Sequence, residues 1–182
     1  MNKLLTNFKN LFKEFGPNED IINMYLVFMG IRSACLISNI NLFYTMPKET
    51  KLEIYFEKYP NMSQTNYDYP LVCLKNSLVS KVINQHSNEF TEHELGLYLG
   101  FNCYNQDWKN IKTNRYSISY ILNETKQKKL AFYNEVCSIQ PDIGTILRIK
   151  FKAHEMSNAL KIINSKYKVT YKIELLKKVK KN

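Results

Sequence analysis

The apolar residues of this chain change their spacing near residue 114, and that change limits the folds that it can adopt. In the first segment they recur every three or four residues, at Leu4, Leu5, Phe8, Leu11, Phe12 and Phe15. After residue 114 they occupy every second position, at Tyr116, Ile118, Tyr120 and Leu122. The first spacing predicts helices and the second predicts strands. The sequence therefore predicts an α+β fold, in which a helical N-terminal part packs on a mostly antiparallel sheet.

The N-terminal part carries clear helix boundaries. Gly16 followed by Pro17 predicts the end of a first amphipathic helix. A second helix is expected from about Pro17, with acidic residues in its first turn and a largely apolar sequence up to Gly30. Residues 31–44 are compatible with a helix or a strand, and residues 71–82 are expected to form a further helix.

The net charge, like the spacing of apolar residues, differs between the two parts of the chain. Residues 1–112 contain 11 Lys and Arg against 11 Asp and Glu, whereas residues 113–182 contain 15 against 5, which accounts for the whole net charge of +10. This asymmetry divides the chain into a neutral, mainly helical part, 1–112, and a basic, β-rich part, 113–182, within one compact domain. A basic part predicts an acidic partner, such as nucleic acid, an acidic protein or an anionic membrane surface.

The C-terminal residues are expected to form a basic β-α-β unit. A strand is predicted at 145–152, a helix at 153–165 and a second strand at 166–176, with apolar and basic residues alternating along both strands. If the helix covers the apolar faces, the basic residues lie together on the opposite face. The predicted polyanion-binding residues are Arg148, Lys150, Lys152, Lys166, Lys168 and Lys172.

Two interpretations of this basic face remain open. It could bind about six phosphates, which would make binding steeply dependent on salt. It could instead be an ordinary solvated sheet face. The outward positions lack the exposed aromatic residues that usually stack on bases in single-strand-binding sheets.

The central segment 90–101, FTEHELGLYLGF, contains a possible functional motif made up of His93, Glu94, Gly96 and Gly100. Thr91 is placed to cap a helix, and the two glycines four residues apart allow another backbone to pack closely. This segment resembles the core motif of DUF3793, a bacterial family of unknown function. Residues 30–43 are similar to an earlier stretch of the same family.

The resemblance to DUF3793 implies no reaction, because the family has no established activity. Genes of the family often lie near flavodoxin and iron-uptake genes. The resemblance therefore implies an adaptor or accessory protein of a redox or iron system, for which an acidic redox protein would be the partner of the basic part.

No motif in the sequence identifies a reaction that the protein could catalyse. His93 lacks a second histidine four residues later, because Leu97 stands there, so the zinc-binding HExxH pattern is not met. Cys103 is the most plausible reactive thiol, but no motif surrounds it. Glycine-rich phosphate loops are missing from the sequence, and neither a metal site nor a cofactor is predicted. A small enzyme that uses Cys103 or His93 is therefore the weakest hypothesis.

The leading hypothesis is a non-catalytic cytoplasmic protein whose basic face binds an acidic macromolecule. Nucleic acid is slightly favoured over an acidic protein. The sequence predicts no transmembrane segment, because its longest apolar run, residues 24–31, is far shorter than the roughly 20 residues needed to cross a bilayer. The four cysteines are expected to be reduced, although the sequence does not decide whether they pair, and it leaves the oligomeric state open.

Overall fold

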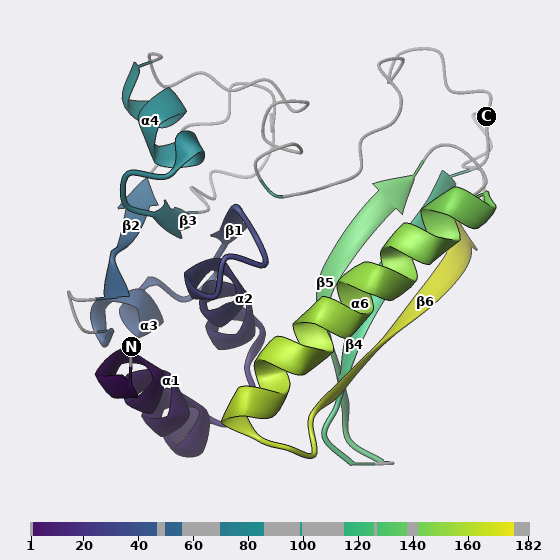
Figure 1. Cartoon of the computed structure of the whole chain (residues 1–182), viewed down its shortest axis with the longest axis horizontal. Helices are drawn as coiled ribbons and strands as arrows, with labels where there is room; N and C mark the ends of the chain where they lie inside the picture. Colours follow the sequence, from purple (N-terminus) through teal and green to yellow (C-terminus); the bar gives the residue numbers. More distant parts are fainter. Residues whose placement is uncertain are drawn as a thin grey trace, which may run out of the picture. The chain divides into compact units, whose positions relative to one another are not determined.

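The computed structural model describes residues 2–46, 50–55, 70–85, 99, 115–125, 127–137 and 142–176. The chain divides into two compact units, Met1–Gly100 and Phe101–Asn182. Each unit combines helices with an antiparallel three-stranded sheet, which confirms the predicted α+β class (Figure 1). The boundary predicted at residues 112 and 113 lies outside the described residues. No helix in the described part of the chain has the length and apolarity needed to cross a bilayer.

The described residues of the N-terminal unit form four helices and three short strands. They follow the chain as α1 (Asn2–Phe15), α2 (Glu19–Phe28), β1 (Ala34–Leu36), α3 (Ile40–Tyr44), β2 (Leu52–Tyr55), β3 (Leu71–Leu74) and α4 (Leu78–Gln85). The strands form a sheet in the order β1-β3-β2, and both neighbours run antiparallel to β3.

Helix α2 forms the centre of this unit, as its apolar sequence predicts. Its residues from Asp20 to Val27 are all buried. Helix α1 packs on α2 through aromatic contacts, in which the ring of Phe8 lies 5.2 Å from Tyr25 and 5.1 Å from Phe28, centroid to centroid. Gly16 follows α1 and Gly30 follows α2, both with positive φ, so the predicted helix end at Gly16 is confirmed.

The buried carboxylate of Asp20 joins α2 to the segment between β1 and α3. Asp20 is 4% exposed. Its oxygens accept hydrogen bonds from the backbone N–H of Ser38, the hydroxyl of Ser38 and the backbone N–H of Asn39, at 2.8–3.1 Å. Charge-assisted hydrogen bonds of this kind hold a loop firmly in place.

The predicted helix at 71–82 is wrong for its first half and confirmed for residues 78–82. Residues Leu71–Leu74 form β3, which is paired on both sides, and the helix begins only at Leu78. Asn76 adopts positive φ between them, and the hydroxyl of Ser77 accepts a hydrogen bond from the N–H of Ser80. A left-handed residue followed by a helix-capping serine interrupts the apparent helical spacing of Leu74, Leu78 and Val82.

The described residues of the C-terminal unit form a sheet and one long helix. Its elements are β4 (Arg115–Asn123), β5 (Lys129–Cys137), α6 (Ile143–Ile163) and β6 (Lys168–Leu176). The strand order is β5-β4-β6, and β4 is antiparallel to both neighbours. Strands β5 and β6 are therefore parallel to each other, and α6 connects them along the sheet (Figure 1). The sheet does end in a β-α-β unit, but β5 is its first strand.

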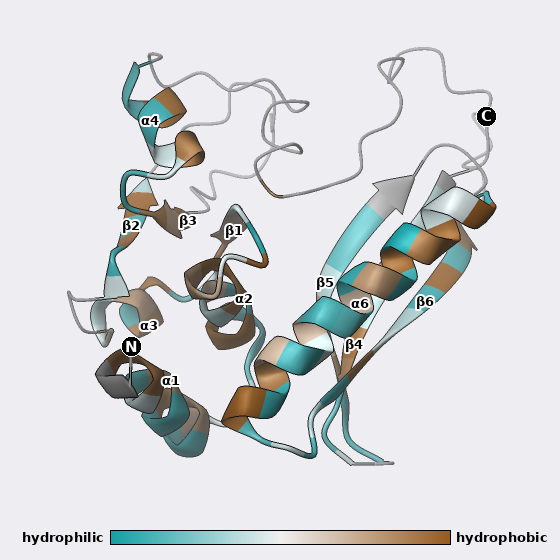
Figure 2. Ribbon diagram, in the orientation of Figure 1, coloured by the Kyte–Doolittle hydropathy of each residue, from teal (hydrophilic) through white to brown (hydrophobic). Residues whose placement is uncertain are grey.

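The strand predicted at 145–152 is wrong, because these residues form the first half of α6. Asp142 caps this helix by accepting a hydrogen bond of 2.7 Å from the N–H of Thr145. The helix buries Ile149, Ala153, Met156 and Leu160, whose spacing of four, three and four residues is helical. Apolar residues also lie on its other faces, and Figure 2 shows hydrophobic and hydrophilic segments alternating along α6. These additional residues produced the apparent alternation of a strand.

We expect Asp20→Ala to lower the free energy of unfolding by about 2–3 kcal/mol, because it removes the acceptor of several charge-assisted hydrogen bonds. Urea denaturation followed by circular dichroism measures the change. Glu14→Ala, which removes an exposed carboxylate from α1, serves as control and should change stability by less than about 0.5 kcal/mol. Equal effects of the two substitutions would contradict the anchoring role of Asp20.

We also expect the cap of α6 to contribute to stability in a pH-dependent manner. Hydrogen bonds from the side chain and the backbone of Thr145 lower the pKa of Asp142 below its usual value. A lowered pKa in the folded state gives stability that is present above the unfolded pKa of about 3.9 and is lost as the pH falls through the folded value. The midpoint temperature of thermal unfolding should therefore be lower for Asp142→Ala than for wild type at pH 7. This difference in midpoint temperature should shrink below about pH 4. A difference that is independent of pH would contradict a charged cap.

Candidate functional site

The six predicted polyanion-binding residues do not share one face of a sheet. Arg148, Lys150 and Lys152 lie on α6, Lys166 lies in the turn that follows α6, and Lys168 and Lys172 lie on β6. The common basic face required a strand at 145–152, which the structure replaces with a helix. A helix places successive residues about 100° apart, so Lys150 points away from the side that Arg148 and Lys152 share.

Lys152 is the clearest departure from the predicted basic face. Its side chain is 18% exposed and forms an ion pair with Glu135 of β5, which is 2% exposed. Its Nζ also donates a hydrogen bond of 3.1 Å to the hydroxyl of Tyr133 and lies 4.6 Å from the centre of that ring. Lys152 therefore belongs to the interior between α6 and the sheet.

The same interior cluster includes Tyr120 of β4. The ring of Tyr120 stacks on Tyr133 with their centroids 5.3 Å apart, and the Nζ of Lys152 lies 5.5 Å from the centre of Tyr120. Burial and the neighbouring charge of Glu135 raise the pKa of Tyr120 above its usual value. The cluster holds one positive and one negative charge in close contact, so it adds no net charge to the surface.

A groove lies beside strand β6 and combines an apolar lining with lysines. Its volume is about 880 Å³, within the range of ligand-binding pockets. One wall is α6 and the other is the first half of β6. The lining residues are Leu147, Lys150, Phe151, Ala153, His154, Ser157, Lys161, Lys168, Val169, Thr170 and Tyr171.

The apolar part of the groove is accessible to a partner. Leu147 and Phe151 lie four residues apart on α6, so they share one side of the helix. They are 59% and 63% exposed, respectively. Such neighbouring exposed apolar side chains beside a concave surface often mark an interaction site.

The charge of the groove is exclusively positive. Lys150, Lys161 and Lys168 are exposed, and none of the lining residues is Asp or Glu. Two of these lysines, Lys150 and Lys168, belong to the predicted binding set, whereas Lys161 does not. Lys172 of that set instead forms an ion pair with Glu174 at 2.6 Å.

Strand β6 contributes its backbone as well as its side chains. The carbonyl oxygen of Lys168 accepts a hydrogen bond from Nδ2 of Asn123 on β4. The N–H of Val169, in the same peptide unit, points the other way and donates to the hydroxyl of Ser157 on α6 at 3.2 Å. Because β6 ends the sheet order, its side away from β4 is an edge within the described residues.

Leu147, Phe151 and Lys161 are not among the predicted site residues, because their segment was predicted as a strand followed by a helix. The signal for one continuous helix was present in Asp142, a residue type favoured at helix N-caps, together with the apolar spacing through Ile149, Ala153 and Met156. A continuous helix of that length places both Leu147 and Lys161 in the wall of the groove beside β6.

The predicted motif residues His93, Glu94, Gly96 and Gly100 lie outside the described residues, as does Cys103. Cys35 and Cys73 are described; both are buried and reduced. Burial raises the pKa of the Cys35 thiol to about 12 and that of Cys73 to about 11. These two thiols are therefore poor nucleophiles at neutral pH. In the described part of the chain, no three His, Cys, Asp or Glu side chains cluster in a way that would hold a metal ion.

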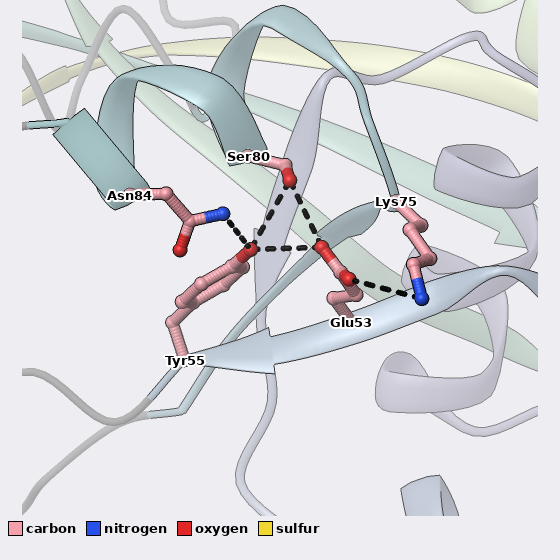
Figure 3. A network of polar contacts seen from close by, with 5 residues as sticks. All are labelled: Glu53, Tyr55, Lys75, Ser80 and Asn84. Carbon is pink, nitrogen blue, oxygen red and sulfur yellow. Dashed lines mark hydrogen bonds and ion pairs between the residues drawn. The ribbon is translucent and has the colours of Figure 1, made fainter.

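A second polar cluster occurs in the N-terminal unit, between β2 and α4 (Figure 3). Oε2 of Glu53 accepts hydrogen bonds from the hydroxyls of Tyr55 at 2.8 Å and Ser80 at 2.9 Å. Nδ2 of Asn84 donates to the Tyr55 hydroxyl at 3.3 Å, and the Nζ of Lys75 lies 4.0 Å from Oε1 of Glu53.

This second cluster holds α4 on the sheet. Ser80 is buried and directs its proton to a carboxylate that also accepts from Tyr55. Burial raises the pKa of Tyr55, so its phenol stays protonated at neutral pH. The arrangement joins two elements through hydrogen bonds and an ion pair. We therefore place the candidate site at the groove beside β6.

We expect Lys152→Met to lower the free energy of unfolding by about 3–5 kcal/mol, because it leaves the buried charge of Glu135 without its partner. The double variant Lys152→Met/Glu135→Leu should recover most of this loss, because it removes both charges. Chemical denaturation of the variants and wild type measures the difference. A single variant as stable as wild type would show that the lysine is not part of the interior.

Comparisons with known proteins add no relative to this description. No family model matches the chain, and no curated protein or solved structure is significantly similar to it. The resemblance of residues 90–101 to DUF3793 stays a prediction.

Proposed function

We propose that the protein is a non-catalytic binding protein whose groove between α6 and β6 holds an acidic segment of a partner protein. The observation that carries this proposal is the coincidence of exposed apolar residues with lysines in one groove. Apolar contacts supply affinity, while the lysines attract acidic partners and discourage basic ones. The groove thus fits a segment that carries both apolar and acidic side chains.

An acidic protein segment fits the groove better than nucleic acid does. The expected phosphate-binding face is dispersed, since Lys152 pairs with Glu135 and Lys172 pairs with Glu174. The face of the sheet away from α6 carries Ser117, Ser119 and Asn134 on β4 and β5, which provide no ring for base stacking. Phosphate binding would therefore depend on a few separate lysines.

The resemblance to DUF3793 adds a candidate for the biological setting. An adaptor of a redox or iron system would meet an acidic redox protein, and the groove offers that partner a basic docking surface. Under this proposal the interaction is one protein to one protein, and the chain itself carries out no reaction.

We expect a nine-residue peptide of alternating glutamate and valine to bind the protein, with affinity that decreases as salt is added. The double reversal Lys150→Glu/Lys168→Glu should weaken binding by about ten-fold or more, equivalent to about 1.4 kcal/mol. Both lysines are exposed, so the folded state should be retained. Isothermal titration calorimetry or fluorescence anisotropy measures the affinities.

The matched control is Lys9→Glu/Lys13→Glu, which makes the same change in net charge at exposed positions of α1. It should leave peptide affinity within about two-fold of wild type after screening by about 0.15 M salt. Equal weakening by both double variants would contradict a local site. Tighter binding of a single-stranded oligothymidine than of the peptide would assign the basic surface to nucleic acid and overturn the proposal.

A further inference from the structure

The outer edge of β6 has a defined pattern of backbone groups. In an antiparallel pair, residues alternate between exchanging hydrogen bonds with the neighbouring strand and pointing their backbone groups away from it. The carbonyl of Lys168 points toward β4 and the N–H of Val169 points away. The alternation then directs the N–H groups of Tyr171 and Ile173 away from β4, and those of Thr170, Lys172 and Glu174 toward it.

The side chains follow the same alternation. Val169, Tyr171 and Ile173 stand opposite Leu122, Tyr120 and Ile118 of β4, which are buried residues of the sheet. Thr170 stands on the other face, where its hydroxyl accepts a hydrogen bond of 2.8 Å from Asn123. Lys168 and Lys172 share that second face with Thr170, because strand residues two apart point the same way.

An exposed strand edge normally carries some protection against pairing with other chains. Strand β6 is nine residues long, and its residues 168–171 line the groove. It contains no proline, and the groove beside it is open to solvent at Leu147 and Phe151. Lysines at this edge discourage pairing with neutral or basic strands and leave it suitable for an acidic one, and Glu174 is the acidic residue of the same strand.

We propose that the partner's acidic segment binds as an added strand along the outer edge of β6. This inference rests on the proposed function, because it specifies how the same groove takes its ligand. Backbone hydrogen bonds to Tyr171 and Ile173 extend the sheet to four strands, as in other cases of strand addition. Alternate side chains of the segment then face α6 or the opposite side of the sheet.

This geometry specifies a sequence pattern for the segment. Side chains that face α6 meet Leu147 and Phe151 and should be apolar. Side chains that face the other way should be acidic where they pass Lys168, and they meet the Lys172–Glu174 ion pair further along the strand. Alternation of apolar and acidic residues over about nine positions, the length of β6, is therefore the expected recognition pattern.

The first test uses amide hydrogen exchange measured by NMR on the wild-type protein, with the glutamate–valine peptide as the probe. Without peptide, the amides of Thr170, Lys172 and Glu174 should exchange slowly and those of Tyr171 and Ile173 quickly. Saturating peptide should slow the amide exchange of Tyr171 and Ile173 by about ten-fold or more, and it should leave the exchange of the neighbouring amides nearly unchanged.

The second test removes the edge hydrogen bonds from either partner. Two peptides are compared, one methylated at the backbone nitrogens of its odd-numbered residues and one at those of its even-numbered residues. Only alternate amides face β6, so one of the two peptides should lose binding and the other should keep it. On the protein, Ile173→Pro removes an outward N–H, which an edge strand tolerates. Ile173→Ala is its control, since it trims the side chain and keeps the N–H. The proline variant should bind at least about ten-fold more weakly than the alanine variant.

The outcomes separate this inference from the proposed function. Peptide binding without protection of Tyr171 and Ile173 overturns strand addition and leaves the groove as the binding site. Failure of the peptide to bind at all overturns the proposed function. Protection of these amides without peptide, together with a dimeric mass in light scattering, would assign the edge to a second copy of the chain and overturn the inference.

Discussion

The C-terminal unit depends on one helix covering one face of a three-stranded sheet. The buried stripe of α6 includes Ile149, Ala153, Met156 and Leu160, and it packs over strand residues such as Ile118, Tyr120 and Leu122. A single helix is about 10 Å wide, whereas strands lie about 4.8 Å apart. It can therefore cover the middle of the sheet, but its sides stay open. The groove beside β6 follows directly from this arrangement.

The ion pair between α6 and the sheet fixes the position of the helix on the sheet. Lys152 reaches Glu135 on β5, and Ser157 reaches the backbone of Val169 on β6. These contacts tie α6 to both outer strands of the sheet. A buried charge pair needs good geometry, because breaking it leaves a charge in a nonpolar surrounding. The helix is thereby held at a fixed place along β6, and a stable wall is what a selective binding groove requires.

Charge distribution and fold together lead to the functional proposal. The excess of lysine in the C-terminal third predicts an acidic partner, but its effect depends on where each lysine lies. One lysine neutralises a buried carboxylate, one pairs with a neighbour on β6, and two reach the groove with a third that the predicted set did not include. Beside a strand edge that pairs with no other strand among the described residues, these lysines favour an extended acidic segment over a regular array of phosphates.

The sequence by itself determined the α+β class, helices α1 and α2, the strands β4 and β6, and the concentration of positive charge. These features are local: they follow from the spacing of apolar residues, from Gly16 and Pro17, and from composition. Tertiary structure decided the state of segments 71–74 and 145–152, because their local patterns suit both helix and strand. Pairing with β1 and β2 made the first a strand, and the sheet that Ile149 and Met156 cover made the second a helix. The groove exists because segment 145–152 is helical. Its lining comes from α6 and β6, and no local sequence pattern specifies that residues of these two elements lie together.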